Sequence, residues 1–154
     1  MQIPHDGFVL IADGRKSLFF RNQGDGEILN LAVERKEVHE NPAHHEQASD
    51  TAGMAMNVVG SHGGTMTEVD FHQLEEDRFA ADTAGLLNAR ALAGGFDSLV
   101  VVAPPKTLGE LRKHYHKEVE KRLVSEVPKD LVNVPVAEIE RILKDHRNAE
   151  LPAA

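Results

Sequence analysis

Nine histidines are the residues of this chain best suited to acid–base or metal chemistry. Imidazole changes charge near neutral pH and is a common zinc ligand. Five of the nine crowd one part of the chain: His39, His44, His45, His62 and His72. No two histidines on an expected helix have the His-x-x-x-His spacing of a helical zinc site, and His114 and His116 would point away from each other on a helix. We therefore expect surface histidines and predict no metal site.

Positive charge is concentrated in one stretch of an acidic chain. The stretch holds the candidate RNA-binding residues Lys106, Arg112, Lys113, Lys117, Lys121 and Arg122. The formal charge of −8 repels phosphate backbones at long range, so a nucleic-acid contact would need such a local patch. The alternative is a solvated surface, because Glu110, Glu118 and Glu120 lie at helical spacings that allow ion pairs with these cations.

The composition argues against several classes of protein. Tryptophan and cysteine are absent and there is one tyrosine, which disfavours base-stacking sites, disulfides and thiol nucleophiles. No dinucleotide fingerprint is present, because Gly24 and Gly26 lead into an expected strand rather than a helix. The first residues lack the features of a signal peptide, and no apolar run approaches the ~18 residues of a membrane span. The sequence predicts a cytoplasmic protein with no cofactor and no membrane contact.

The apolar patterns predict how secondary structure positions these residues. Three strands separated by turns should pair antiparallel, at 7–12, 17–21 and 27–38. Six elements should follow: a helix at 71–92 ended by Gly94-Gly95, a doubly buried strand at 98–103, a helix capped by Thr107 with Glu110, a helical turn at 117–122, an edge strand within 123–134 and a helix led by Pro135. This order, βββαβαβα, predicts an α/β fold with a mixed β-sheet and helices on its faces.

One domain is expected over residues 1–154, a length near the usual size of a single domain. Residues 39–67 have no sustained apolar period and are rich in His, Asn, Ser, Asp and Gly. We expect a long mobile loop at about 39–67. Loops of this length are commonly either functional or disordered.

Two segments resemble the bacterial host attachment protein family, whose members are named for a role in attachment to host cells. Segment 96–112 contains Ala-Pro-Pro and Leu-Gly-Glu-Leu-Arg, and segment 126–131 contains Lys-Asp-Leu before a proline-led helix. The resemblance covers roughly residues 5–146. That family is similar to the middle domain of archaeal and eukaryotic peptide chain release factors. The resemblance implies a ribonuclease-H-like fold and a ribosomal or RNA partner.

In the release-factor domain, a Gly-Gly-Gln loop just before the long helix helps water attack peptidyl-tRNA. The nearest equivalent here is Gly63-Gly64-Thr65, and these three are the candidate catalytic residues. Glycines permit backbone conformations that other residues forbid, but Thr65 lacks the side-chain amide of glutamine. Ordinary loop glycines are the competing explanation.

The ribonuclease-H analogy also raises a two-metal nuclease, which needs converging carboxylates. The candidates are Asp13, Asp70 and Asp130. Asp13 is better explained as the turn partner of Gly14, and Asp70 as a residue at a helix start. No Gly-x-Ser-x-Gly motif marks a serine nucleophile either.

The leading interpretation is a non-enzymatic binding or adaptor module linked to host attachment and associated with the ribosome or RNA. Two alternatives stay open. One is a release-factor-like hydrolase acting on peptidyl-tRNA, and the other is a cytosolic regulatory protein acting through a protein partner. The sequence predicts neither a reaction nor an oligomeric state.

Overall fold

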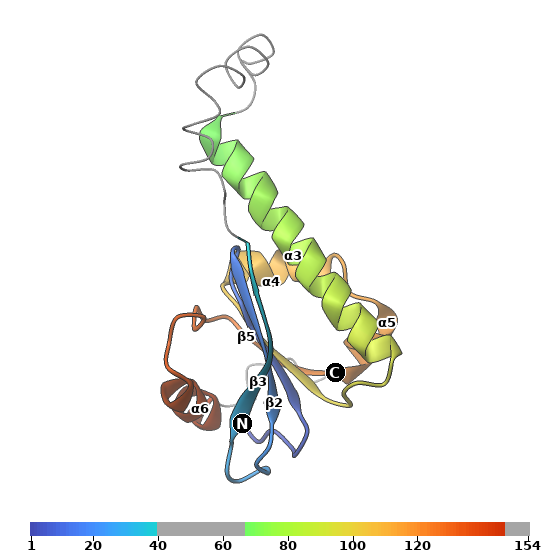
Figure 1. The fold of residues 1–154 in the computed structure, drawn as a ribbon, viewed down its shortest axis with the longest axis vertical. Helices are drawn as coiled ribbons and strands as arrows, with labels where there is room; N and C mark the ends of the chain where they lie inside the picture. The colour runs from blue at the N-terminus through green and yellow to red at the C-terminus, as the bar shows by residue number, and fades with distance from the viewer. Residues whose placement is uncertain (40–66, 147–154) are drawn as a thin grey trace.

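The computed structural model describes residues 1–39 and 67–146 of the chain. A five-stranded sheet lies at its centre, built from β1 (Phe8–Ala12), β2 (Lys16–Asn22), β3 (Leu31–Val38), β4 (Leu99–Val102) and β5 (Leu123–Val127). The strand order is β3-β2-β1-β4-β5 (Figure 1). β1, β2 and β3 pair antiparallel, whereas β4 and β5 extend the sheet parallel to β1. The predicted α/β fold with a mixed sheet is confirmed.

Helices cover both faces of the sheet. On one face lie α3 (Glu68–Leu92), α4 (Pro105–Arg112) and α5 (Lys117–Arg122), and on the other lies α6 (Val136–Asp145) (Figure 1). The helical turn predicted at 117–122 is confirmed as α5. Counted as a helix of its own, it adds one helix to the predicted order βββαβαβα. The N-terminal half of α3 extends beyond the end of the sheet, and all buried residues of this helix lie from Phe79 onward.

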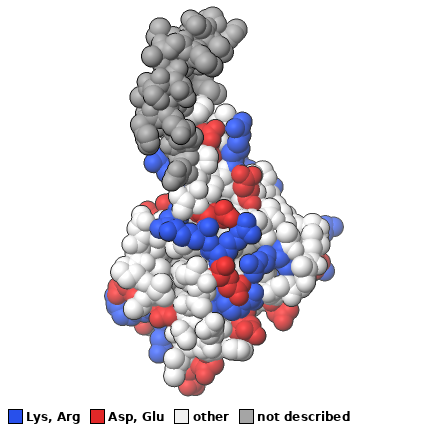
Figure 2. All heavy atoms as spheres, viewed as in Figure 1, with Lys and Arg blue, Asp and Glu red and all other residues white. Residues whose placement is uncertain are grey.

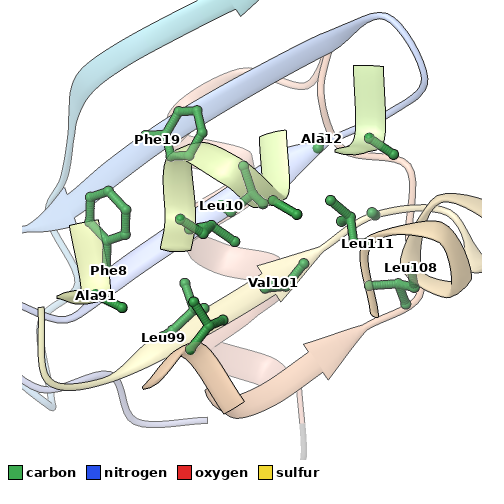
Figure 3. Close-up of a cluster of buried hydrophobic side chains, with 14 of the residues drawn as sticks. Phe8, Leu10, Ala12, Phe19, Ala91, Leu99, Val101, Leu108 and Leu111 are labelled. Carbon is green, nitrogen blue, oxygen red and sulfur yellow. The ribbon is translucent and has the colours of Figure 1, made fainter. Parts of the chain in front are cut away.

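The central strands are buried on both sides. Phe8 and Leu10 of β1 pack towards α3 and α4, whereas Val9 and Ile11 pack towards α6. Figure 3 shows the first of these two cores, where side chains of β1, β2 and β4 meet residues of α3 and α4. Burial on two faces explains why β1 and β4 are unbroken apolar runs in the sequence.

The predicted starts of α3 and β3 were wrong, because side chains close to each start form hydrogen bonds with the backbone. α3 begins before residue 71, since Thr67 accepts a hydrogen bond from the Asp70 backbone N–H at 3.1 Å and the Asp70 carboxylate accepts from the Thr67 N–H. β3 begins only at Leu31. Before it, the carboxylate of Asp25 accepts from the backbone N–H groups two and three residues later and forms a turn.

Prolines account for the remaining differences between the predicted and the observed element boundaries. The predicted cap at Thr107 was wrong, because α4 begins at Pro105 and Thr107 lies inside its first turn. β5 is at the edge of the sheet as predicted, but it ends at Val127 because the next residue, Pro128, has no N–H to donate. Pro135 occupies the N-cap of α6 rather than its first turn.

Candidate nucleic-acid interface

The six basic residues predicted to bind RNA lie on α4, on α5 or in the linker between them. Buried Leu108, Leu111 and Val119 pack these helices against the rest of the domain, so the charged side chains point outward. Five of the six residues are exposed: Lys106, Arg112, Lys113, Lys117 and Lys121. We call these five the α4–α5 basic face.

The sixth residue, Arg122, has a structural role. Its side chain is 22% exposed and donates to the carbonyl oxygens of Phe96 and Glu118, both at 2.9 Å. It also donates to the Glu118 carboxylate at 2.8 Å. Arg122 therefore joins α5 to the segment before β4, and little of its guanidinium group is available to a ligand.

Carboxylates neutralise part of the basic face. Three members have partners at these nitrogen–oxygen distances: Arg112 with Glu126 at 3.0 Å, Lys113 with Glu110 at 2.6 Å and Lys121 with Glu118 at 3.0 Å. Within the described ranges, Lys106 and Lys117 have no carboxylate partner. The helical spacing correctly predicted the pairs of Glu110 and Glu118, but the pair predicted for Glu120 does not form among the described residues. The pair of Arg112 with Glu126 joins two different elements.

Glu118 is the most strongly held of these carboxylates. Hydrogen bonds from Arg122 and then from Lys121 lower the pKa of Glu118 from 4.5 to about 2. Its carboxylate is therefore ionised throughout the physiological pH range and stays charged beside both cations.

Asn88 of α3 holds the linker between α4 and α5. Its amide donates to the His114 carbonyl at 2.9 Å and accepts from the His116 N–H at 2.8 Å. His116 in turn caps α5, because its Nδ1 accepts from the Glu118 N–H at 3.0 Å. Sequence reasoning missed Asn88. The only signal was a poor helix former beside the buried stripe of a long helix.

The single tyrosine lies in the same linker. Its hydroxyl is buried and has no hydrogen-bond partner among the described residues. Burial, and then the nearby charge of Glu126, raise the pKa of Tyr115 well above its usual range. Tyr115 is therefore a neutral phenol packed against the core.

On the face of the molecule shown in Figure 2, basic and acidic side chains are interspersed. No broad field of one sign is visible on this side of the molecule. On the α4–α5 basic face, three of the five cations are paired with carboxylates, so a phosphate ligand would have to use individual cations rather than a uniformly positive surface.

A model of bacterial archaeo-eukaryotic release factor family 12 matches residues 6–143, which is most of the chain. The chain belongs to this family. No match was found among curated proteins. The release-factor relationship that the resemblance implied is confirmed, whereas the family description does not mention host attachment.

In this release-factor-like domain, the candidate residues Gly63, Gly64 and Thr65 lie outside the described residues. The two flanks of that segment are described. Nε2 of His39, just after β3, lies 3.1 Å from the Glu75 carboxylate of α3. The chain thus leaves the sheet beside the projecting half of α3.

Two of the three carboxylates considered for a nuclease, Asp13 and Asp70, have the structural roles that the sequence predicted. Asp13 accepts from the N–H groups of Arg15 and Lys16 in the turn between β1 and β2, and Asp70 caps α3. Across residues 1–39 and 67–146, no three histidine, aspartate or glutamate side chains come together in a group that could hold a metal ion. No helix of this part of the chain has the length and apolar character needed to cross a membrane.

Proposed function

We propose that this domain is a binding module that associates with the ribosome or another RNA through the α4–α5 basic face. Residues 105–122 contain six basic and three acidic side chains, a local excess of three positive charges in a chain of charge −8. Salt screens the remaining negative charge beyond about 8–10 Å, so a local patch can still attract phosphate. The observation that supports the proposal best is that five of the six cations are exposed on α4, α5 and the linker between them. Asn88 of α3 holds this linker in place through its two hydrogen bonds.

The existing ion pairs do not prevent such binding. Exposed ion pairs contribute little net stability, because water and salt compete with them. A phosphate group can therefore replace a carboxylate at Arg112, Lys113 or Lys121. Five phosphate contacts to single-stranded RNA would give a log–log salt slope of about −3.5, which is a loss of roughly a hundredfold in affinity between 50 and 200 mM salt.

The test is the affinity of the protein for a fluorescein-labelled RNA oligonucleotide, measured by anisotropy across this salt range. The double variant Lys117→Ala/Lys121→Ala should bind more weakly and with a shallower salt slope. Its matched control is Lys36→Ala/Lys144→Ala, which removes the same charge from exposed positions on β3 and α6. Equal losses in the two variants, or no RNA binding by the wild type at low salt, would refute the proposed interface.

A second measurement places the protein in the cell. Native lysate is sedimented through a sucrose gradient at low and moderate salt, and the protein is followed by antibody. We expect co-migration with ribosomes that is lost as salt rises. A protein that stays at the top of the gradient and is recovered with a stable protein partner would favour the regulatory alternative instead.

We also propose a second candidate, a release-factor-like hydrolase of peptidyl-tRNA. It is supported by family membership and by the position of Gly63-Gly64-Thr65 just before Thr67, which caps the long helix α3. Release of a labelled peptide from peptidyl-tRNA on ribosomes tests it. Full activity in Gly63→Ala/Gly64→Ala would remove this candidate, whereas loss of release with unchanged RNA affinity would support it.

The proposal extends to host attachment. We propose that any effect of this domain on attachment is indirect and follows from its binding to RNA or the ribosome. Deletion followed by complementation with Lys117→Ala/Lys121→Ala tests this. If the variant restores attachment fully, attachment does not depend on the α4–α5 basic face.

A further inference from the structure

Glu118 is the carboxylate that a ligand of the α4–α5 basic face must displace. It contacts two cations at once, Lys121 at 3.0 Å and Arg122 at 2.8 Å. Arg122 does not move freely, because it also donates to the backbone oxygens of Phe96 and Glu118. The Glu118 carboxylate is thus held in place by a residue that has a structural role of its own.

This arrangement favours the contact with Lys121. Most exposed ion pairs are weak because two long side chains must be ordered at once. Here Arg122 has already ordered the Glu118 carboxylate, which is 28% exposed, so only the 70% exposed side chain of Lys121 has to adopt one geometry. The pKa of Glu118, lowered to about 2, agrees with a carboxylate that stays charged beside two cations.

A second exposed cation lies close to Lys121 on α5 and could bind phosphate together with it. Lys117 lies four residues earlier on α5, on the same side of the helix, and is exposed with no carboxylate partner among the described residues. Side chains at this spacing are neighbours, with roughly 5–6 Å between their Cβ atoms. Once Lys121 leaves Glu118, the two ammonium groups can contact neighbouring phosphates.

From this geometry we infer that Glu118 competes intramolecularly with phosphate for Lys121, so that the α4–α5 basic face selects ligands with several adjacent phosphates over single phosphate groups. An isolated phosphate would replace one held carboxylate at little gain. An RNA backbone replaces several carboxylates within one binding event, and later contacts benefit from the high effective concentration that the first ones create. This inference rests on the proposed RNA-binding function.

The test compares two isosteric variants of α5. Glu118→Gln removes the competitor, whereas Glu120→Gln makes the same change in net charge at an exposed residue without an ion pair in the described part of the chain. Glu118→Gln should raise RNA affinity about fivefold. Its log–log salt slope should equal that of the wild type, because RNA replaces Glu118 at Lys121 in the wild type too and the number of phosphate contacts is therefore the same. Glu120→Gln should change affinity less than twofold and leave the slope unchanged.

The inferred selectivity is measured in the same assay. Inorganic phosphate and a mononucleotide should displace labelled RNA from wild-type protein only at concentrations far above those of an unlabelled oligonucleotide. Their relative potency should rise in Glu118→Gln. Equal effects of the two glutamine variants on RNA affinity and on this relative potency would overturn the competition, because net charge alone would then explain both.

A readout without RNA separates this inference from the proposed function. A carbodiimide adds to a carboxyl group, a contacting amine then attacks the activated carbonyl to form an amide, and the carbodiimide leaves as its urea. It should therefore join Glu118 to Lys121 in the wild-type protein. Mass spectrometry of the digested protein should detect this link in Glu120→Gln but not in Glu118→Gln. Absence of the link from wild-type protein would overturn the competition, whereas a clear link with no RNA binding by any variant would refute the RNA-binding function and with it the inferred ligand class.

Discussion

Replacing Asn22 by alanine should destabilise the domain more than any exposed substitution, because this buried side chain organises three chain segments. Its amide nitrogen contacts the carbonyl oxygens of Ile3 at 2.8 Å and of Pro4 and Asp25 at 3.2 Å. Its amide oxygen accepts from the N–H groups of Gly24 and Asn30, both at 2.9 Å. The side chain is fully buried at the end of β2.

The size of the effect follows from these contacts. An amide nitrogen has two hydrogens, so about four hydrogen bonds are lost at a net ~1 kcal/mol each. Water can reach some of the partly buried partners, which reduces the expected loss in the free energy of unfolding to about 3 kcal/mol. For a domain of this size, that loss lowers Tm by roughly 6–12 °C.

Thermal unfolding followed by circular dichroism, with urea unfolding as a second measure, tests this expectation. The matched control is Asn30→Ala, because Asn30 is exposed and its hydrogen bonds in the described structure are made by its backbone N–H and carbonyl, which the substitution keeps. The control should change stability by less than about 0.5 kcal/mol. A loss below about 1 kcal/mol for Asn22→Ala, or equal losses for the two variants, would refute the assigned role of the side chain.

Three further outcomes are expected. Gly24→Ala should lower the free energy of unfolding by more than about 2 kcal/mol in urea titrations, since its Cβ would lie 1.9 Å from the Ile28 carbonyl oxygen, while Gly26→Ala, with its nearest atom at 3.9 Å, should have little effect. Because the folded-state pKa of Glu118 is about 2 and its ordinary value is 4.5, its contribution to stability is present above pH 4.5 and lost as pH falls towards 2. The fall in Tm over that range should therefore be smaller in Glu118→Gln than in wild type. Tyr115→Phe should leave Tm unchanged or raise it, since the buried hydroxyl has no partner among the described residues, and a clear fall in Tm would show that the hydroxyl has a partner.

Local sequence patterns were enough to predict the type and order of most elements. The unbroken apolar run of β1 predicted a strand, and that of β4 predicted one buried on both faces, because only a strand between two layers must be apolar on both sides. The glycines after α3 marked its end, where Gly94 adopts a φ of 71°. Boundaries were less accurate where a side chain such as Asp25 competes with the strand by binding its own backbone.

The candidate interface depends both on the local sequence and on the tertiary structure. The sequence alone was enough to predict the cations of α4 and α5 and the ion pairs of Glu110 and Glu118, because residues three or four apart on a helix are neighbours. It also predicted a pair for Glu120, which does not form among the described residues. Only the tertiary structure decided that Arg122 donates to the Phe96 carbonyl, that Glu126 pairs with Arg112, and that Asn88 binds the linker between α4 and α5. These contacts join residues 14 to 26 positions apart. No local pattern encodes such contacts, because they form only once the sheet has brought separate elements together.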